Sequence, residues 1–160
     1  MFSHVLIAYD GSPSAERALE AGARLAKGLG AKVTVFHSRL QGPIPETFRE
    51  HGAASPKAGD SHHVGSFYEA SSLHEQDLDE IGSRLLQEAR STAEGYGLGD
   101  VQTVQRAGDA AKQILEHARE NDVDTVVVGT RGHGQVAEIA LGSVSHKLQH
   151  AFPGCVLTVH

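Results

Sequence analysis

The chain contains a single cysteine and no apolar run long enough to cross a membrane. One thiol, Cys155, cannot form an intramolecular disulfide or a cysteine-rich zinc site, and we expect it to be a small buried residue in a reducing compartment. The N-terminus has no basic region before its short apolar stretch, which argues against a signal peptide. A membrane-spanning helix needs roughly 20 apolar residues. These absences predict a soluble, cytoplasmic protein without a membrane partner.

An excess of positive charge is also missing. The chain has 14 Lys and Arg residues against 20 Asp and Glu residues, which gives a formal net charge of -6. Proteins that bind nucleic acid usually present a basic face, and those that bind single strands interleave it with aromatic residues. Here the basic residues are scattered and are not interleaved with Phe or Tyr, so we expect no nucleic-acid partner.

The order of apolar segments predicts the fold class. One domain covering residues 1–160 is expected, because a chain of this length can bury a single core. Five short apolar segments are typical of buried strands, at residues 5–9, 33–37, 101–106, 125–128 and 156–159. Helical spacing predicts four helices between them, at about residues 13–29, 78–94, 110–118 and 144–151. The alternation predicts an α/β fold: a single doubly wound, Rossmann-like domain with a five-stranded parallel sheet and helices on both faces.

Residues at about 40–72 do not follow this alternation. They are rich in Gly, Pro, Ser and His and have little periodicity, which predicts a flexible insertion. Histidines and an aspartate around it suggest a metal site, with candidate ligands His51, Asp60, His62, His63 and His74. Their separations do not resemble those of zinc sites, so a solvated polar surface is the favoured interpretation.

Glycine-rich turns follow two of the predicted strands. The first strand runs into Asp10-Gly11-Ser12, and the fourth runs into Gly129-Thr130-Arg131-Gly132. Gly142-Ser143 then precedes the last helix. Glycines let the backbone approach an anion closely, and amide groups at a helix start can point at phosphate oxygens. The sequence therefore predicts a phosphate-binding site at the carboxyl ends of the strands.

The spacing of these glycines identifies a family. No P-loop motif and no dinucleotide-binding Gly-x-Gly-x-x-Gly motif follows a strand. Instead, Gly129 and Gly132 are separated by two residues, and nine residues separate Gly132 from Gly142-Ser143. This spacing resembles the ATP-binding signature of the universal stress protein family. Most of the chain outside residues 40–72 is similar to that family, including the turn at Asp10 and the helix cap at Asp109.

The resemblance implies which residues contact the nucleotide. Gly129, Gly132, Gly142 and Ser143 would surround the triphosphate, with Val144 beside them as a backbone contact. Asp10 would approach the ribose or a metal-bound phosphate. Three further residues, Ala8, Tyr9 and Ser38, would contact adenine. The family usually has proline at position 8 and an apolar residue at position 38, so the adenine pocket is expected to differ in shape.

Each polar candidate also has a simpler interpretation. Asp10 can be the first residue of an Asx turn, in which its carboxylate accepts from the backbone two residues on. Asp109 can be a helix cap. Arg131 and His133 lie within the predicted phosphate loop and could neutralise phosphate charge, but exposed loop side chains of this kind often have no ligand. If a triphosphate is bound, Mg²⁺ is expected with it, because this ion is typically held by one or two carboxylates together with phosphate oxygens, and Asp10 is the candidate.

The sequence favours binding over catalysis. A phosphotransferase needs a nucleophile or a residue that positions water, and neither a convincing base nor a nucleophile elbow is present. The leading interpretation is an ATP-binding regulatory module of the stress response. A slow ATPase is a second interpretation, and a dimeric interaction protein with an empty pocket or another nucleotide is a third. The final strand is expected at a sheet edge. The resemblance implies a homodimer that pairs through it.

Overall fold

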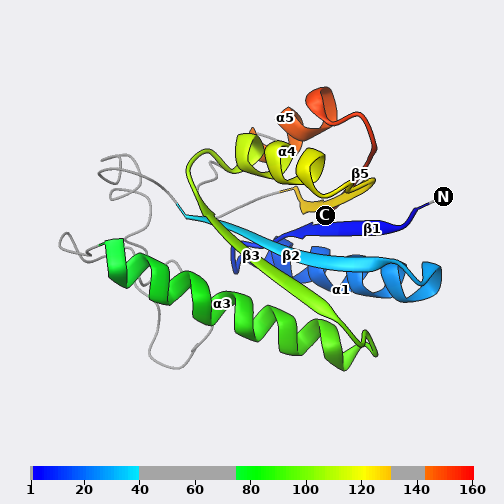
Figure 1. Ribbon diagram of the computed structural model, residues 1–160, viewed down its shortest axis with the longest axis horizontal. Coiled ribbons are helices and arrows are strands. Elements are labelled where there is room, and N and C mark those ends of the chain that lie inside the picture. The colour runs from blue at the N-terminus through cyan, green and yellow to red at the C-terminus, as the bar shows by residue number, and fades with distance from the viewer. Residues whose placement is uncertain (1, 40–74, 131–142) are drawn as a thin grey trace.

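The computed structural model describes residues 2–39, 75–130 and 143–160 (Figure 1). The predicted insertion at about 40–72 lies outside the described residues, as do Gly132 and Gly142. The elements, in chain order, are β1 (His4–Ala8), α1 (Pro13–Leu29), β2 (Lys32–Arg39), α3 (Glu75–Gly95), β3 (Val101–Ala107), α4 (Ala110–Glu120), β4 (Thr125–Gly129), α5 (Ser143–Ala151) and β5 (Cys155–Val159). All nine match elements expected from the sequence.

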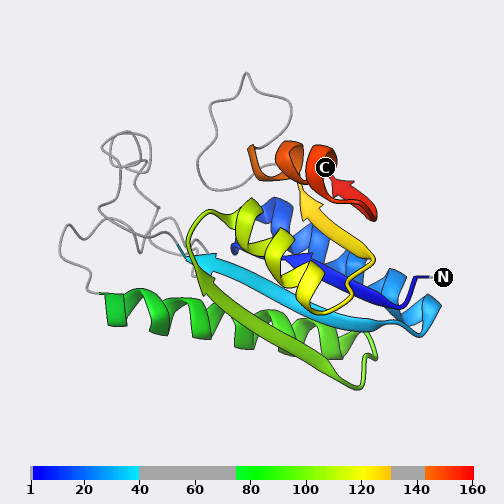
Figure 2. The same ribbon diagram turned by 45° about the horizontal axis from the view of Figure 1, so that its top comes forward.

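The five strands form one parallel sheet in the order β3-β2-β1-β4-β5. In this order β1 lies at the centre, beside β2 on one side and β4 on the other. Helices α1 and α3 cover one face of the sheet, and α4 and α5 cover the other (Figures 1 and 2). The predicted doubly wound α/β fold is therefore confirmed.

Local sequence signals fix the ends of the helices that flank β1 and β3. Ser12 caps α1, since its hydroxyl accepts from the backbone N–H of Ala15, and Pro13 occupies the first turn. Gly30 ends α1 in the left-handed conformation, at φ 64°. Asp109 caps α4 by accepting from the backbone N–H of Lys112 at 3.0 Å, which confirms the simpler interpretation of this residue.

Two core clusters lie on opposite faces of the sheet. Strand side chains alternate between faces, so Ile7 packs toward α1 and α3, together with Leu86, while Phe36 packs toward α4 and α5, together with Leu148. Each of these side chains is at most 5% exposed. Burying one contributes about 1.5–3 kcal/mol. The cores hold the strand ends in fixed positions relative to the helices.

Cys155 is exposed, so the expectation of a small buried cysteine is wrong. It is the first residue of β5, which has β4 as its one neighbouring strand in the sheet. An edge strand is covered less completely than a central strand, and the burial of β5 alternates between half-buried and exposed. The short apolar run correctly predicted a strand, but it did not predict how much of that strand is covered.

No helix within residues 2–39, 75–130 and 143–160 combines the length and hydropathy needed to cross a bilayer.

Candidate functional site

The sheet order makes the carboxyl ends of β1 and β4 the point where the strand order reverses. From β1 the chain winds outward to β2 and β3, and it then crosses back to β4 and β5 on the other side. The connections that leave β1 and β4 therefore diverge onto opposite faces of the sheet. In open α/β sheets this point of divergence is where ligands bind. The two strands that the sequence analysis singled out are thus neighbours, and their carboxyl ends meet at this point (Figure 2).

Asp10 forms the turn that leaves β1. Its Oδ1 accepts from the backbone N–H of Ser12 at 2.9 Å, which is an Asx turn, and Gly11 between them has a φ of 76°. The simpler interpretation of Asp10 is therefore present in the structure. It does not exclude a ligand role, because the side chain is only partly buried and a carboxylate has lone pairs for several partners.

Tyr9 is held firmly just before this turn. Its backbone N–H donates to the Phe36 carbonyl at 2.8 Å, and its own carbonyl accepts from Nδ1 of His37 at 2.9 Å. The ring is 5% exposed, and its hydroxyl donates to Glu16. Burial, together with this hydrogen bond, raises the pKa of the Tyr9 hydroxyl, so the phenol stays neutral. The Tyr9 side chain thus belongs to the core beside α1 and α3.

Ala8 and Ser38 lie at the ends of the neighbouring strands β1 and β2. Ala8 is paired with Phe36 and packs against the core on the α4 side. The Ser38 hydroxyl donates to the Gly108 carbonyl at 2.9 Å and ties the end of β2 to the turn after β3. The structure therefore brings Ala8, Tyr9 and Ser38 to the same edge of the sheet.

Gly129 ends β4 where α1 begins. A Cβ on Gly129 would lie 2.5 Å from Oγ of Ser14 and 2.8 Å from the Ser14 carbonyl oxygen, closer than real side-chain atoms approach. This glycine is thus required for packing, whatever it binds. Its absence of a side chain lets the first turn of α1 approach the end of β4. Beyond it, the backbone N–H of Thr130 donates to the Val159 carbonyl at 2.9 Å.

Helix α5 carries the last two candidates. Ser143 is its first residue, and Val144 is half-buried against the core. The first N–H groups of a helix have no partner within it, and the helix dipole adds partial positive charge there. Ser143 therefore stands at a helix start, where backbone amide groups can meet an anion. Gly132 and Gly142 of the glycine-rich loop are not among the described residues.

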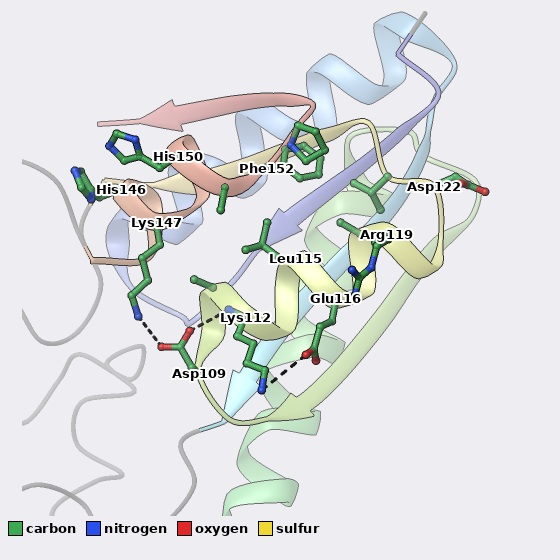
Figure 3. A pocket seen from close by; sticks show the side chains of 15 residues that line it. Asp109, Lys112, Leu115, Glu116, Arg119, Asp122, His146, Lys147, His150 and Phe152 are labelled. Atoms are coloured by element: carbon green, nitrogen blue, oxygen red, sulfur yellow. Dashed lines mark hydrogen bonds and ion pairs between the residues drawn. The ribbon is translucent and has the colours of Figure 1, made fainter.

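A charge pair at this end of the fold has no signal in the sequence. Lys147 of α5 donates to Oδ2 of Asp109 at 2.8 Å, which joins α5 to the start of α4 (Figure 3). The hydrogen bond from Lys147, followed by that from the Lys112 backbone, holds the pKa of Asp109 below its usual value. The residues are 38 positions apart, so no local pattern could have linked them.

Two contacts of Tyr9 were also missed. Glu16 carried a weak signal as an acidic residue in the first turn of α1, and His37 carried one as a polar residue within an apolar strand. Their shared partner is visible only in three dimensions.

Among the described residues, no group of three or more His, Cys, Asp or Glu side chains is placed to hold a metal ion. A metal at Asp10 would therefore need other ligands, such as phosphate oxygens and water.

Comparisons with known proteins find relatives that match nearly the whole chain. The universal stress protein YxiE of Bacillus subtilis is 31% identical over 166 residues, with 99% of each chain covered. A universal stress protein of Thermus aquaticus is 30% identical over 162 residues, again with 99% of each chain covered.

Solved structures share the fold. A universal stress protein in complex with cAMP has a TM-score of 0.68 and 23% identity, and covers 99% of this chain and 97% of its own. The universal stress protein of Archaeoglobus fulgidus in complex with dAMP has a TM-score of 0.64 and 20% identity, and covers 100% of this chain and 98% of its own. The universal stress protein family also matches the sequence over residues 1–160. The chain belongs to the universal stress protein family.

Proposed function

We propose that this chain binds an adenine nucleotide, ATP with Mg²⁺, and acts as a regulatory module of the stress response in the cytoplasm. The observation that carries the proposal is the meeting of the Asp10 turn with the end of β4 at the point where the sheet connections diverge. The glycine spacing of the sequence begins at that same strand end. Two structural relatives are in complex with cAMP and dAMP, which supports adenine as the base.

The residues divide into three groups in this proposal. Ala8, Tyr9 and Ser38 flank the adenine. Tyr9 contributes through the second lone pair of its carbonyl, because its N–H donates to Phe36 and its ring is buried in the core. Gly129, Gly132, Gly142, Ser143 and Val144 surround the phosphates. Asp10 approaches the ribose or a phosphate-bound Mg²⁺, for which one carboxylate is sufficient. The metal would neutralise phosphate charge.

Calorimetry on a matched pair of variants tests the role of Asp10. Asp10→Asn keeps an amide oxygen that can accept from Ser12, so the turn persists while the charge is lost. We expect the affinity for ATP with Mg²⁺ to fall about tenfold, equivalent to about 1.4 kcal/mol, and the affinity without Mg²⁺ to change less.

Asp109→Asn is the control. Asparagine also caps helices well, so α4 keeps its cap and loses only the pairing with Lys147. Nucleotide affinity should remain unchanged. Equal Mg²⁺-ATP affinities in wild type and Asp10→Asn would contradict the assignment of Asp10.

The proposed function as a whole requires that the wild type binds ATP. A protein that neither binds ATP nor releases an adenine nucleotide on denaturation would contradict it. Product release faster than about one turnover per second would favour an enzyme instead.

We also propose a homodimer that pairs through β5. This strand is apolar, lies at the edge of the sheet, and leaves Leu157 37% exposed. An apolar edge offers backbone hydrogen-bonding groups to a second strand. Light scattering at micromolar concentration should give a dimer, and Leu157→Lys should give a monomer. Gln102→Lys, on the opposite edge strand β3, should remain a dimer. A monomeric wild type would overturn this part of the proposal.

A further inference from the structure

A pair of histidines stands on α5, outside the proposed nucleotide site. His146 and His150 are both exposed, and they lie on the wall of an open groove of about 990 Å³ between α4 and α5. Figure 3 shows the two rings side by side at one end of this groove. Neither side chain has a role in the fold's core, and the nucleotide proposal does not use them.

The spacing of the pair is that of a metal chelate. Residues four apart on a helix lie on the same face, one turn above the other. Two histidines at this separation are the helical zinc ligands of metalloproteases. In this chain the same separation occurs without the glutamate that supplies the base in those enzymes, since Lys147 follows His146. The pattern therefore indicates metal binding and carries no indication of hydrolysis.

The distance between the rings also fits one shared ion. The ring centroids are 4.6 Å apart, and the planes are tilted by 63°. A bound zinc lies about 2 Å from a ring nitrogen, hence about 3 Å from the ring centre, so two rings on one ion have centres roughly 4.5–5 Å apart. The observed separation falls in this range, and small rotations about the side-chain bonds would bring one nitrogen of each ring to the ion.

The nearby charges permit a cation. Lys147, between the two histidines in sequence, is turned to Asp109, with Nζ 2.8 Å from the carboxylate, so its positive charge is compensated by an ion pair (Figure 3). The chain as a whole has a formal net charge of -6. Both conditions reduce the electrostatic cost of placing a divalent ion beside α5.

We propose that His146 and His150 form a two-residue chelate for a late divalent transition-metal ion, with water completing the coordination. Two imidazoles suit Cu²⁺, Ni²⁺ and Zn²⁺, and among these Cu²⁺ binds most tightly to a given set of nitrogen ligands. Two protein ligands are fewer than the three or four of catalytic and structural zinc sites, so the ion exchanges readily. The site is independent of nucleotide binding.

The test titrates Cu²⁺ into the full chain near pH 7.5, since protons compete with a metal ion for imidazole nitrogen at lower pH. The matched variant carries His150→Ala together with Ala151→His. Both positions are exposed, and the exchange keeps the composition, the charge and the number of histidines. It changes the separation from four residues to five, which places the second imidazole on a different side of the helix.

Calorimetry should show that the first Cu²⁺ equivalent binds at least about tenfold more weakly to the exchanged variant, because the two rings no longer act as one chelate. Electron paramagnetic resonance should show coordination by two nitrogens from these residues in the wild type, and this signature should be absent when both are replaced by glutamine. Circular dichroism and ATP calorimetry should be unchanged. Identical Cu²⁺ titrations of the wild type and the exchanged variant would overturn the proposal, whatever the outcome for ATP.

Discussion

The two ends of the parallel sheet differ in how their polar groups are used. At the amino-terminal end, Asp124 accepts from the backbone N–H and hydroxyl of Ser3 and from the backbone N–H of His4. The His4 ring donates from Nδ1 to the Asn121 carbonyl at 3.0 Å, and its Nε2 is hydrogen-bonded to the Thr34 hydroxyl at 2.9 Å. At this end, hydrogen bonds join residues that are far apart in the sequence.

The carboxyl-terminal end is built differently. Asp10 accepts from a backbone group within its own turn, and Gly129 allows the start of α1 to approach β4. Helix α5 begins at this end as well. Long-range contacts occur here as well, from Ser38 to the Gly108 carbonyl and from Lys147 to Asp109. The backbone amide groups at the starts of α1 and α5 suit a site that binds an anion. The hydrogen bonds of Asp124 and His4 assign the first end to the stability of the fold. Our proposal assigns the second end to nucleotide binding.

Two glycine substitutions, one at each end of the sheet, should give the largest effects. They test whether the two ends differ in ATP binding. A Cβ on Gly129 meets Ser14 at the carboxyl-terminal end, and a Cβ on Gly154 meets the Asp124 carbonyl oxygen at the amino-terminal end. We expect each Gly→Ala variant to lose about 1–3 kcal/mol of unfolding free energy, measured in urea, because the added methyl group would overpack its site. Only Gly129→Ala should also lose ATP affinity.

Gly28→Ala is the control for these variants. Nothing lies within 4 Å of a Cβ there, and the residue is in α1, so alanine should stabilise the protein by about 0.5–1 kcal/mol. Equal loss of ATP affinity in Gly129→Ala and Gly154→Ala would contradict the proposal that nucleotide binds only at the carboxyl-terminal end of the sheet.

Removing Asp124 should give the next largest effect. Asp124→Ala leaves the Ser3 and His4 donors without their acceptor, and we expect a loss of about 1–3 kcal/mol in urea unfolding. Asp124→Asn keeps one acceptor oxygen and should lose less. ATP affinity should be unchanged in both variants, and a changed affinity would contradict the assignment of this end to stability.

The carboxyl of Asp124 also predicts acid sensitivity. Burial alone would raise its pKa, but the hydrogen bonds from Ser3, Thr125 and His4 outweigh burial and leave the pKa below its usual value. Such a group stabilises the fold above its unfolded pKa of about 3.9, and the contribution is lost as the pH falls through the folded pKa. Asp124→Asn should therefore reduce the fall of the unfolding free energy at acid pH, measured by urea unfolding at a series of pH values.

A smaller pH effect is expected from His117, at the end of α4. The ring is 6% exposed, and burial, followed by the charge of Arg106, lowers its pKa. The unfolded chain therefore binds this proton more readily, so stability is present above about pH 6.5 and declines as the pH falls below it. His117→Gln should reduce the slope between pH 7 and pH 5. An unchanged slope would show that other groups cause it.

The features that the sequence predicted correctly depend on neighbouring residues. Contacts within a few positions cap the start of α1 at Ser12, its end at Gly30 and the start of α4 at Asp109. The short apolar runs correspond to the strands. The exposure of Cys155 was predicted wrongly, because coverage depends on which strand ends at the sheet edge. The burial of a strand cannot be read from its own composition.

The site shows the same limit. The turn at Asp10 could be placed from the sequence, since an Asx turn is local. The packing reason for Gly129 could not, because Ser14 lies on another element. The contacts of Tyr9 with His37 and Glu16 likewise join three elements, so the direction of its ring became known only with the fold.

Backbone amide shifts in an ATP and Mg²⁺ titration, followed by nuclear magnetic resonance, test the central claim most directly. The account predicts the largest changes at the carboxyl-terminal end, at Tyr9, Asp10, Ser38, Gly129 and Val144. It predicts little change at Ser3, His4 and Gly154. Changes concentrated at these last three residues, or along the groove between α4 and α5, would contradict it.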